Sequence, residues 1–557
     1  MSVSPHTTAV RTITGAQAVV ESLLGNGIDC GFGIPSIHNI AIYEGLRRAT
    51  PFHHWVVRHE QAAGYAADGF RRQSGRIAAV FASTGPGNLF TLVPLLESLQ
   101  SDTPVLVIGT NIASALHAGQ GGALHETPDQ IDVFRPLTRF ARRVKNPAEI
   151  SDVFSEAMAV LRGPAPGPAF IEIPHDLLAA TFTPLSSSAQ RSPELSPPAD
   201  LASAIHQIQK ARRPVLLVGG GVSGDLEPVR QLAEILQGPV FTTTSGKGNF
   251  PADHSLFMGC ISRLGVAQEI FNESDLLLSL GARFTEFDTG RFQLKLPDEH
   301  IQIVPHIDYP GTRVHASLRI VADSTEAATL FGASLDGRSP WCDIKPQLAG
   351  EEQRLHALNS EAWQALRLLR GTLDRRDVLV NDQSILNYWA SAFFPVFEPH
   401  TFLYPYGSGT LGYGLPAAIG AACAVQRTGS AQKIVCVAGD GGFQYTLPEL
   451  ATLAQYQLPV KILLVNDEAY GVIGFLQRSV FGQTHEVALK NPDFCRLAES
   501  YGIPGERAVS FAELEQKMPA WFQRPGPALL EWRTVLKAPW EAGAIPRPTG
   551  IAMKENS

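Results

Sequence analysis

The chain has 557 residues, of which 44% are hydrophobic and 18% are charged, a composition typical of a globular protein with several buried cores. Its formal net charge is −8 and no basic block occurs in the sequence, so we expect no nucleic-acid partner. The six cysteines show no CxxC spacing, which disfavours a disulfide framework or a zinc site. No apolar run is long enough to span a membrane, and the first residues lack the pattern of a secretory signal. We therefore expect a cytoplasmic protein that does not contact a membrane.

Short apolar runs alternate with amphipathic stretches along the chain, which predicts an α/β protein with three doubly wound domains and mainly parallel sheets. In the first domain, residues 1–184, strands are predicted at DCGFGIP, RIAAVFAST, TPVLVIGT and PAFIEIP. A Ser- and Pro-rich linker is predicted at residues 185–200. The central domain, residues 201–345, contains RRPVLLVGGGVSG, PVFTTT, DLLLSLGARF and IQIVPHID. A polar, helix-prone connecting segment, residues 346–376, is expected to cross the surface before the third domain, residues 377–557.

The first domain contains four features that could carry function. Glu60 stands directly before a helix rich in small residues, where a glutamate is often only stabilised by the helix dipole. The turn ASTGPGN, residues 82–88, places two glycines after a buried strand. His38 in GFGIPSIHN and His125 in ALHETPDQ lie in loops, where a lone histidine is usually only a polar contact. Only a wider pattern can separate a functional role from a structural one for these residues.

The most informative segment is GDGGFQYTLPELATLAQYQLPVKILLVND, residues 439–467. It predicts a glycine turn after one buried strand, a helix, and a second buried strand that ends in an acidic loop. Both strands of such a crossover run the same way, so Asp440 and Asp467 are expected at the same edge of the sheet. Two carboxylates beside a glycine turn suit a divalent cation that carries a diphosphate.

This segment resembles the cofactor motif of thiamin diphosphate enzymes, which begins with GDG and ends in paired asparagines. Asn466 matches the first asparagine, whereas Asp467 stands where the second, metal-binding asparagine is usual. An aspartate retains an oxygen ligand, so we expect the metal site to persist. The resemblance implies Mg²⁺ as the metal, with Asp440, Asp467 and the backbone carbonyl of Ala469 as ligands.

The resemblance extends to the other motifs and implies a pyrimidine-binding first domain, a central domain and a diphosphate-binding third domain. The stretch GSGTLGYGLPAAIGA, residues 407–421, resembles the segment that wraps the cofactor in acetolactate synthases. Glu60 would hydrogen-bond N1′ of the aminopyrimidine and so promote formation of the C2 ylid. The implied cofactor-binding residues are Glu60, Gly85, Pro86, Gly87, Gly409, Thr410, Leu411, Gly439, Asp440, Gly441, Gly442, Asp467, Ala469, Tyr470 and Gly471.

Glu60, His38 and His125 are the expected catalytic residues, because the two histidine loops approach the reactive carbon in this family. The loops resemble most closely those of 5-guanidino-2-oxopentanoate decarboxylases, which implies non-oxidative decarboxylation of a small 2-oxo acid through an enamine intermediate. A carboligase of the acetolactate synthase kind, or a carbon–carbon lyase of the benzaldehyde lyase kind, is the alternative. A homologue that only binds the cofactor is a further reading, against which the intact Glu60 and Asp440 argue. Ile473 stands where pyruvate decarboxylases carry a catalytic glutamate, which disfavours that activity.

The central domain of acetolactate synthases binds FAD, and LGARFTEFDTG and PHIDYPG resemble the corresponding segments there. Thr285 and Glu286, however, stand where paired aspartates are usual, and VGGGVSG, residues 218–224, is not GxGxxG. These departures favour a nucleotide fold that no longer binds FAD, although flavin stays an alternative. Because the two halves of the cofactor site lie in separate domains, the resemblance implies that two chains form each site. A homodimer is the expected minimum, and a homotetramer is the expected assembly.

Overall fold

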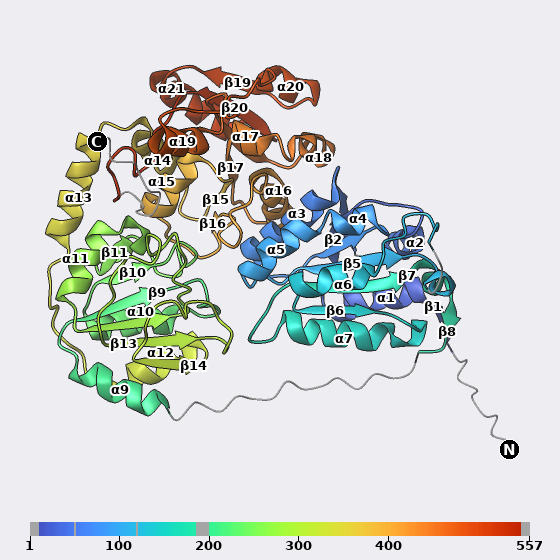
Figure 1. The fold of residues 1–557 in the computed structure, drawn as a ribbon, viewed down its shortest axis with the longest axis horizontal. Helices are drawn as coiled ribbons and strands as arrows, with labels where there is room; N and C mark the ends of the chain where they lie inside the picture. The colour runs from blue at the N-terminus through green and yellow to red at the C-terminus, as the bar shows by residue number, and fades with distance from the viewer. Residues whose placement is uncertain (1–10, 50–51, 118–120, 185–199, 547–557) are drawn as a thin grey trace. The chain divides into compact units, whose positions relative to one another are not determined.

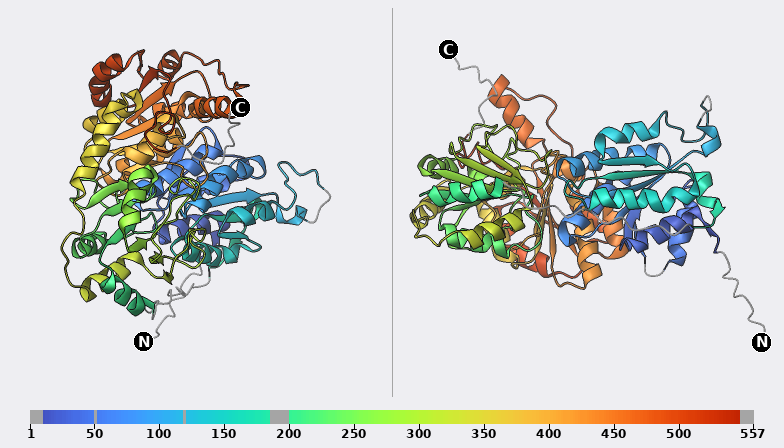
Figure 2. Two further views of the ribbon diagram at one scale, coloured as in Figure 1. Left: turned by 60° about the vertical axis from the view of Figure 1, so that its left-hand side comes forward. Right: turned by 90° about the horizontal axis from the view of Figure 1, so that it is seen from below.

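The computed structural model describes residues 11–49, 52–117, 121–184 and 200–546. These residues form three six-stranded sheets, in which all neighbouring strands are parallel, and one antiparallel pair of short strands (Figure 1). Helices flank each of the larger sheets, as two further views also show (Figure 2). The chain divides into two compact units, Met1–Glu194 and Leu195–Ser557, and the second unit contains two of the sheets. The predicted α/β class with three doubly wound domains is therefore confirmed.

The first unit is built on a sheet with the strand order β3-β2-β4-β5-β7-β6. Its strands are short apolar runs of the kind that parallel sheets bury on both faces. Helices α1, α2 and α7 contribute to one core on one face of this sheet, and α3 packs against α5. The strands are β1 (Ile13–Thr14), β2 (Cys30–Gly33), β3 (His53–Val56), β4 (Ala79–Ala82), β5 (Leu106–Asn111), β6 (Phe140–Arg143), β7 (Ala169–Pro174) and β8 (Thr181–Phe182). The helices are α1 (Gly15–Gly25), α2 (Ile40–Arg48), α3 (Glu60–Ser74), α4 (Pro86–Leu89), α5 (Leu92–Gln100), α6 (Gln130–Phe134), α7 (Ile150–Leu161) and α8 (His175–Ala179).

The central sheet has the order β11-β10-β9-β12-β13-β14. Alternate residues of its middle strand enter different cores, since Leu216 and Val218 belong to one buried cluster whereas Val215 and Leu217 belong to another. Both faces of the sheet are therefore covered, as a doubly wound fold requires. The strands are β9 (Pro214–Val218), β10 (Val240–Thr242), β11 (Phe257–Cys260), β12 (Leu276–Leu280), β13 (His300–Val304) and β14 (Leu318–Val321). The helices are α9 (Asp200–Lys210), α10 (Glu227–Leu236), α11 (Gly265–Glu273) and α12 (Ser324–Ser334).

The third sheet has the order β16-β15-β17-β18-β20-β19. Its strands are β15 (Val378–Asn381), β16 (Phe402–Leu403), β17 (Ile434–Gly439), β18 (Val460–Asn466), β19 (Gly505–Ala508) and β20 (Ala528–Arg533). The helices of this part are α13 (Lys345–Ala357), α14 (Glu361–Thr372), α15 (Ile385–Phe393), α16 (Gly414–Thr428), α17 (Asp440–Phe443), α18 (Leu450–Tyr456), α19 (Gly471–Phe481), α20 (Phe494–Ser500) and α21 (Phe511–Gln523).

The connecting segment at residues 346–376 is mostly helical. Helix α13 carries a largely polar sequence, as expected of a surface segment. Helix α14 instead buries Ala365, Leu366 and Leu369 in the same core as the third sheet. The polar residues on the outer face of α14 make the segment polar on average, so its composition alone does not reveal the apolar stripe.

No helix of the described residues is both long and apolar enough to cross a membrane. The six cysteines form no disulfide among the described residues, and four of them are buried. The predicted linker lies almost wholly outside the described residues, with only Asp200 described, as the first residue of α9.

Candidate active site

Several turns meet at the carboxyl edge of the first sheet. The hydroxyl of Ser36, after β2, donates to Ser83 Oγ, after β4, at 2.7 Å. The buried side chain of Gln130 accepts the N–H of Gly85 at 2.9 Å and donates to Glu172 Oε2 at 2.8 Å. The glycine turn is therefore fixed from two sides. Sequence reasoning did not single out Ser36, Ser83 or Gln130, because neither the sequence pattern nor the cofactor motif marks them.

The same turn brings together three of the predicted site segments. Glu60 is the first residue of α3 and is partly buried. A Cβ atom on Gly87 would lie 3.0 Å from Glu60 Oε1, and a Cβ atom on Gly85 would lie only 2.2 Å from the carbonyl oxygen of His125. Gly85 also has a φ of +64°, which favours glycine. Close contact with Glu60 and His125 thus requires glycine at both positions, with Pro86 exposed between them at the start of α4.

His38 and His125 lie close together, and a third histidine joins them. The ring centroid of His38 is 5.3 Å from that of His125 and 5.2 Å from that of His175. Burial, followed by the charges of His175 and His125, lowers the pKa of His38 below its usual range. His175 follows β7 and was missed, because a histidine at the start of a short helix carries no motif.

In the third sheet, Asp440 and Asp467 follow neighbouring parallel strands. Gly439 of β17 pairs with Val465 of β18, so the two aspartates emerge at the same edge, as predicted. Asp440 is only 2% exposed, and burial raises its pKa. Burial, and then the charge of Asp440, raises the pKa of Asp467 to about 7.

A divalent cation suits this pair of carboxyls. Asp440 is buried and Asp467 is partly buried. Two such negative charges at short range repel each other, and a cation between hard oxygen ligands removes that repulsion. The backbone N–H of Ala469 donates to Asp467, and the loop is held by antiparallel pairing of Ala469 with Ala488. The chemistry of the donors fits Mg²⁺ at Asp440 and Asp467, and the assignment of the Ala469 carbonyl as a third ligand stays a prediction.

The GDGG turn packs against the loop after β18. A Cβ atom on Gly441 would lie 2.7 Å from the ring of Tyr470, and a Cβ atom on Gly471 would lie 2.4 Å from Asp467 Oδ2. Close packing between protein segments therefore explains glycine at both positions. The turn and the loop can hold the aspartates at short range only with these small residues.

Asp382 links two of the predicted cofactor segments. Its carboxylate accepts the backbone N–H groups of Gln383 at 2.7 Å, Gly412 at 3.1 Å and Gly414 at 3.2 Å. A Cβ atom on Gly442 would lie 3.1 Å from Asp382 Oδ1. Asp382 is 1% exposed, and burial raises its pKa to about 6.

Asp382 thus joins the segment that contains Gly409, Thr410 and Leu411 to the GDGG turn. Gly409 has a φ of +65° and Leu411 is partly buried. The sequence did not reveal Asp382, because two of its hydrogen-bond donors are backbone N–H groups that lie 30 and 32 residues later in the chain.

A buried polar network supports the metal loop. Asn491 donates to Asp440 Oδ2 and, at 2.9 Å, to Asn466 Oδ1. Asn466 in turn donates to Glu531 Oε1 at 2.7 Å. Asn466 was predicted as part of the motif, whereas Asn491 and Glu531 were not.

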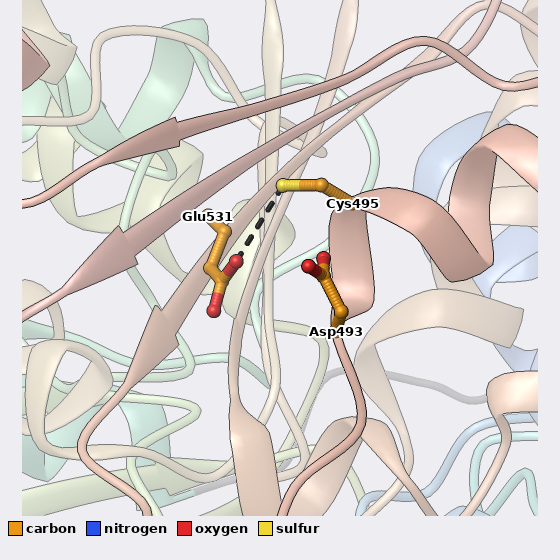
Figure 3. Close-up of side chains that lie close together, drawn as sticks. All are labelled: Asp493, Cys495 and Glu531. Atoms are coloured by element: carbon orange, nitrogen blue, oxygen red, sulfur yellow. Dashed lines mark hydrogen bonds between the residues drawn. The ribbon is translucent and has the colours of Figure 1, made fainter.

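The cluster of Asp493, Cys495 and Glu531 is the only group of three possible metal ligands within 4.8 Å of one another among the described residues (Figure 3). Arg507 donates to Glu531 Oε2 at 2.6 Å and to Asp493 Oδ1 at 2.7 Å. The guanidinium of Arg507 thus pairs with both carboxylates, and Arg533 adds a second positive charge at Glu531 Oε1, at 3.1 Å. Burial raises the pKa of Cys495 to about 12, so its thiol stays protonated. This cluster is an ion-pair network that holds Glu531, and it offers no reason to place a second metal.

The glycine turn of the central domain does not resemble an open phosphate cradle. A Cβ atom on Gly219 would lie 2.1 Å from the carbonyl oxygen of Gly281, and one on Gly221 would lie 2.6 Å from the hydroxyl of Tyr309. Asn249 donates to the carbonyl oxygens of Gly219 and Val222. The chain itself fills the space beside this turn, so these residues fit a flavin poorly.

Comparison with known proteins gives matches along almost the entire chain. The family model for the N-terminal TPP binding domain of thiamine pyrophosphate enzymes matches residues 13–133, that for the central domain residues 201–330, and that for the C-terminal TPP binding domain residues 383–532. The chain is 34% identical over 538 residues to the probable 2-ketoarginine decarboxylase AruI of Pseudomonas aeruginosa, with 94% of each protein covered. It is 28% identical over 555 residues to the large subunit of acetolactate synthase isozyme 1 of Escherichia coli, with 96% of each covered.

A solved structure shares the fold. It is a Mycobacterium smegmatis protein assigned as a thiamin diphosphate-dependent enzyme, and it superposes with a TM-score of 0.78 at 22% identity, with 94% of this chain and 100% of that chain covered. The predicted site residues from His38 to His125 and from Gly409 to Gly471 lie within the residues that the N-terminal and C-terminal models match. The chain belongs to the family of thiamin diphosphate-dependent enzymes.

Proposed function

We propose that this chain catalyses the non-oxidative decarboxylation of a small 2-oxo acid with thiamin diphosphate and Mg²⁺. The observation that carries the proposal is the position of His38 and His125 beside the glycine turn that contacts Glu60. Decarboxylation to an aldehyde needs a proton at the carbon that loses carbon dioxide, and imidazoles are suited to deliver one near neutral pH. The 34% identity to a protein named as a probable 2-ketoarginine decarboxylase supports the same reaction class.

In this proposal, the partly buried carboxyl of Glu60 and the turn of Gly85, Pro86 and Gly87 would hold the aminopyrimidine of thiamin diphosphate. Asp440 and Asp467 would hold Mg²⁺ for its diphosphate. When bound, thiamin diphosphate supplies an acceptor for the electrons of the bond that breaks as carbon dioxide leaves. The protein contributes orientation, the carboxyl of Glu60 as a hydrogen-bonding group, and a proton for the product.

The second candidate is a carboligase or lyase, and the acetolactate synthases among the relatives favour it. In a carboligase, a second carbonyl compound takes the place of the proton. The imidazoles of His38 and His125 would then move a proton to and from a hydroxyl group. The two candidates differ in their product, and in whether a proton or a second carbonyl compound reacts after carbon dioxide has left.

We infer further that the functional assembly is a homodimer or a homotetramer without FAD. Exposed apolar side chains gather on the loops and helices around the carboxyl edge of the first sheet, and burial by a second copy would remove them from water. They are Ile37, Ile40, Phe90, Val93 and Leu124. The protein-filled glycine turn of the central domain supports the proposed absence of flavin.

The test is to incubate the purified chain with thiamin diphosphate, Mg²⁺ and a panel of 2-oxo acids, with aliphatic, aromatic and guanidino side chains. Carbon dioxide and organic product are measured in the same sample. Aldehyde in equal amount to carbon dioxide establishes the decarboxylase. Acetolactate or another hydroxyketone supports the carboligase instead, and cleavage of added hydroxyketones alone supports the lyase.

A further inference from the structure

Three histidines of the first unit form a row, with the buried one in the middle. His38 is 9% exposed and follows β2, His125 is exposed and lies in the loop before α6, and His175 is partly buried and begins α8. The centroid of His38 lies 5.3 Å from His125 and 5.2 Å from His175. The row therefore runs from solvent at His125, through the buried His38, to His175.

His38 lacks the hydrogen bond at Nδ1 that a buried histidine with a purely structural role would form. Its Nδ1 atom is buried, and no described residue forms a hydrogen bond with it. Buried polar atoms are nearly always hydrogen-bonded, and exceptions often mark a functional site. A shared metal does not explain the row, because within the described residues these three histidines do not form a group whose ligand atoms all lie within 4.8 Å.

His175 and His38 have different charged neighbours. Asp176 stands next to His175 and is fixed by the hydroxyl and the backbone N–H of Ser114, at 2.6 and 2.8 Å. Burial opposes the ionised form of Asp176, but the hydrogen bonds from Ser114, followed by the charge of His175, leave its pKa below the usual range. A carboxylate therefore stands beside His175. The charges that act on His38 are those of His175 and His125, and both disfavour its protonation. Glu126, beside His125, accepts the backbone N–H of Ala123 at 3.1 Å.

We propose that His175, next to the carboxylate of Asp176, holds the proton that His38 delivers to the product. A proton from water then replaces it through the exposed His125. This inference rests on the proposed decarboxylation and assigns a residue to one step of it. Loss of carbon dioxide from a 2-oxo acid anion leaves an electron pair on the former carbonyl carbon, and one proton added there gives the aldehyde. His38 is the residue that touches the reacting group, and His175 is a positioning residue that acts through His38.

The first experiment tests the coupling without substrate or cofactor. Diethyl pyrocarbonate modifies neutral imidazoles only, and mass spectrometry of the full chain after digestion reports the rate at His38. In His175→Gln the like charge next to His38 is removed, so the pKa of His38 rises and its modification at pH 6, relative to pH 7.5, slows by about two-fold. His53→Gln, at an exposed histidine of β3, is the matched control and leaves the ratio unchanged. His175→Asn replaces His175→Gln if the latter has a lower thermal midpoint than the wild type.

The second experiment separates proton delivery from decarboxylation in the holoenzyme. With ferricyanide present, two equivalents of oxidant remove the electron pair left by carbon dioxide, water supplies the added oxygen atom, and the acid rather than the aldehyde is released. We expect His175→Gln to lower aldehyde release by at least about ten-fold, with carbon dioxide release in ferricyanide changed by less than about two-fold. His53→Gln changes neither rate.

Equal losses in both assays overturn the delivery role, because they indicate general damage to the site. An unchanged pH ratio for His38 in both His175 variants overturns the coupling. If the wild type forms no aldehyde from any 2-oxo acid, the proposed function and the delivery step fail together, and the modification ratio still decides whether the two imidazoles are coupled.

Discussion

The side-chain amide of Asn491 donates a hydrogen bond to the carboxylate of Asp440, which lies 51 residues earlier in the chain. The same amide donates to Asn466 Oδ1 at 2.9 Å, so one side chain joins the two ends of the cofactor motif. Groups that orient a metal ligand typically change metal affinity by about ten- to a hundred-fold when they are removed. The orientation of Asp440 thus depends on a residue outside the motif.

The first prediction follows directly from this contact. Asn491→Ala frees the Asp440 carboxylate to rotate, and we expect Mg²⁺ to bind about ten-fold more weakly at a fixed concentration of thiamin diphosphate. Isothermal titration with Mg²⁺ measures the change. Ser500→Ala, on the exposed side of α20, is the control and should bind Mg²⁺ as the wild type does. Wild-type affinity in Asn491→Ala would show that Asp440 is oriented without it.

Two glycines of α19 give a matched pair for the second prediction. A Cβ atom on Gly471 would lie 2.4 Å from Asp467 Oδ2, whereas one on Gly474 would find its nearest neighbours at 3.4 Å or beyond. Gly471→Ala should therefore displace Asp467 and lose most cofactor-dependent activity. Gly474→Ala should retain activity, and the added helix propensity can raise stability by up to about 1 kcal/mol. Mg²⁺ titration and thermal unfolding of both variants provide the readouts, and equal behaviour of the two would count against this placement of Asp467.

The third prediction concerns Glu60, whose Oε1 would lie only 3.0 Å from a Cβ atom on Gly87. Glu60→Gln keeps the size of the side chain but removes the acid, and loss of a positioned acid typically lowers rates by about 10²- to 10⁴-fold. We expect turnover to fall within that range while the protein still binds thiamin diphosphate in a fluorescence titration. Glu21→Gln, on the exposed face of α1, controls for loss of one carboxylate. Retained turnover in Glu60→Gln would show that the carboxyl of Glu60 does not act in the reaction.

The strands that the sequence predicted are those marked by a continuous run of apolar residues. The central strands β4, β5, β9, β12, β17 and β18 are continuous apolar runs, and each was found. The two-residue strands β1 and β8 and the edge strands β3, β6, β11, β14, β16 and β19 were missed, because they are short and because polar residues such as His53 and Arg143 interrupt some of the apolar runs. The inner strands β15 and β20 were missed as well, although their sequences VLVN and ALLEWR are largely apolar. The stretch from Arg135 to Lys145 alternates cations with apolar residues, a pattern typical of an amphipathic surface, but it contains the edge strand β6.

The candidate site was predictable where a motif carries it and not where tertiary contacts do. Asp440 and Asp467 follow from strand order alone, because neighbouring parallel strands must end at one edge. Gln130, Asp382 and Asn491 act through partners 30 or more residues away, and a single sequence does not contain that pairing. His175 falls in the same class, since only the packing of the loop after β7 beside the loop after β2 places it next to His38.

The fourth prediction is a pH dependence of stability that comes from His300, which is buried in the central sheet. Its Nδ1 donates to the carbonyl oxygen of His315 at 2.9 Å and its Nε2 lies 2.8 Å from Ser279 Oγ, and burial lowers its pKa to about 4. The unfolded chain binds a proton at this residue below about pH 6.5, whereas the folded chain does so only below about pH 4. The stabilisation is therefore complete above pH 6.5 and is lost as the pH falls towards 4, by about 3 kcal/mol at most.

In His300→Gln the thermal midpoint should fall less steeply between pH 6.5 and 4.5 than in the wild type. His206→Gln, at an exposed position of α9, should keep the wild-type slope, and a wild-type slope in His300→Gln would show that other groups set the acid sensitivity.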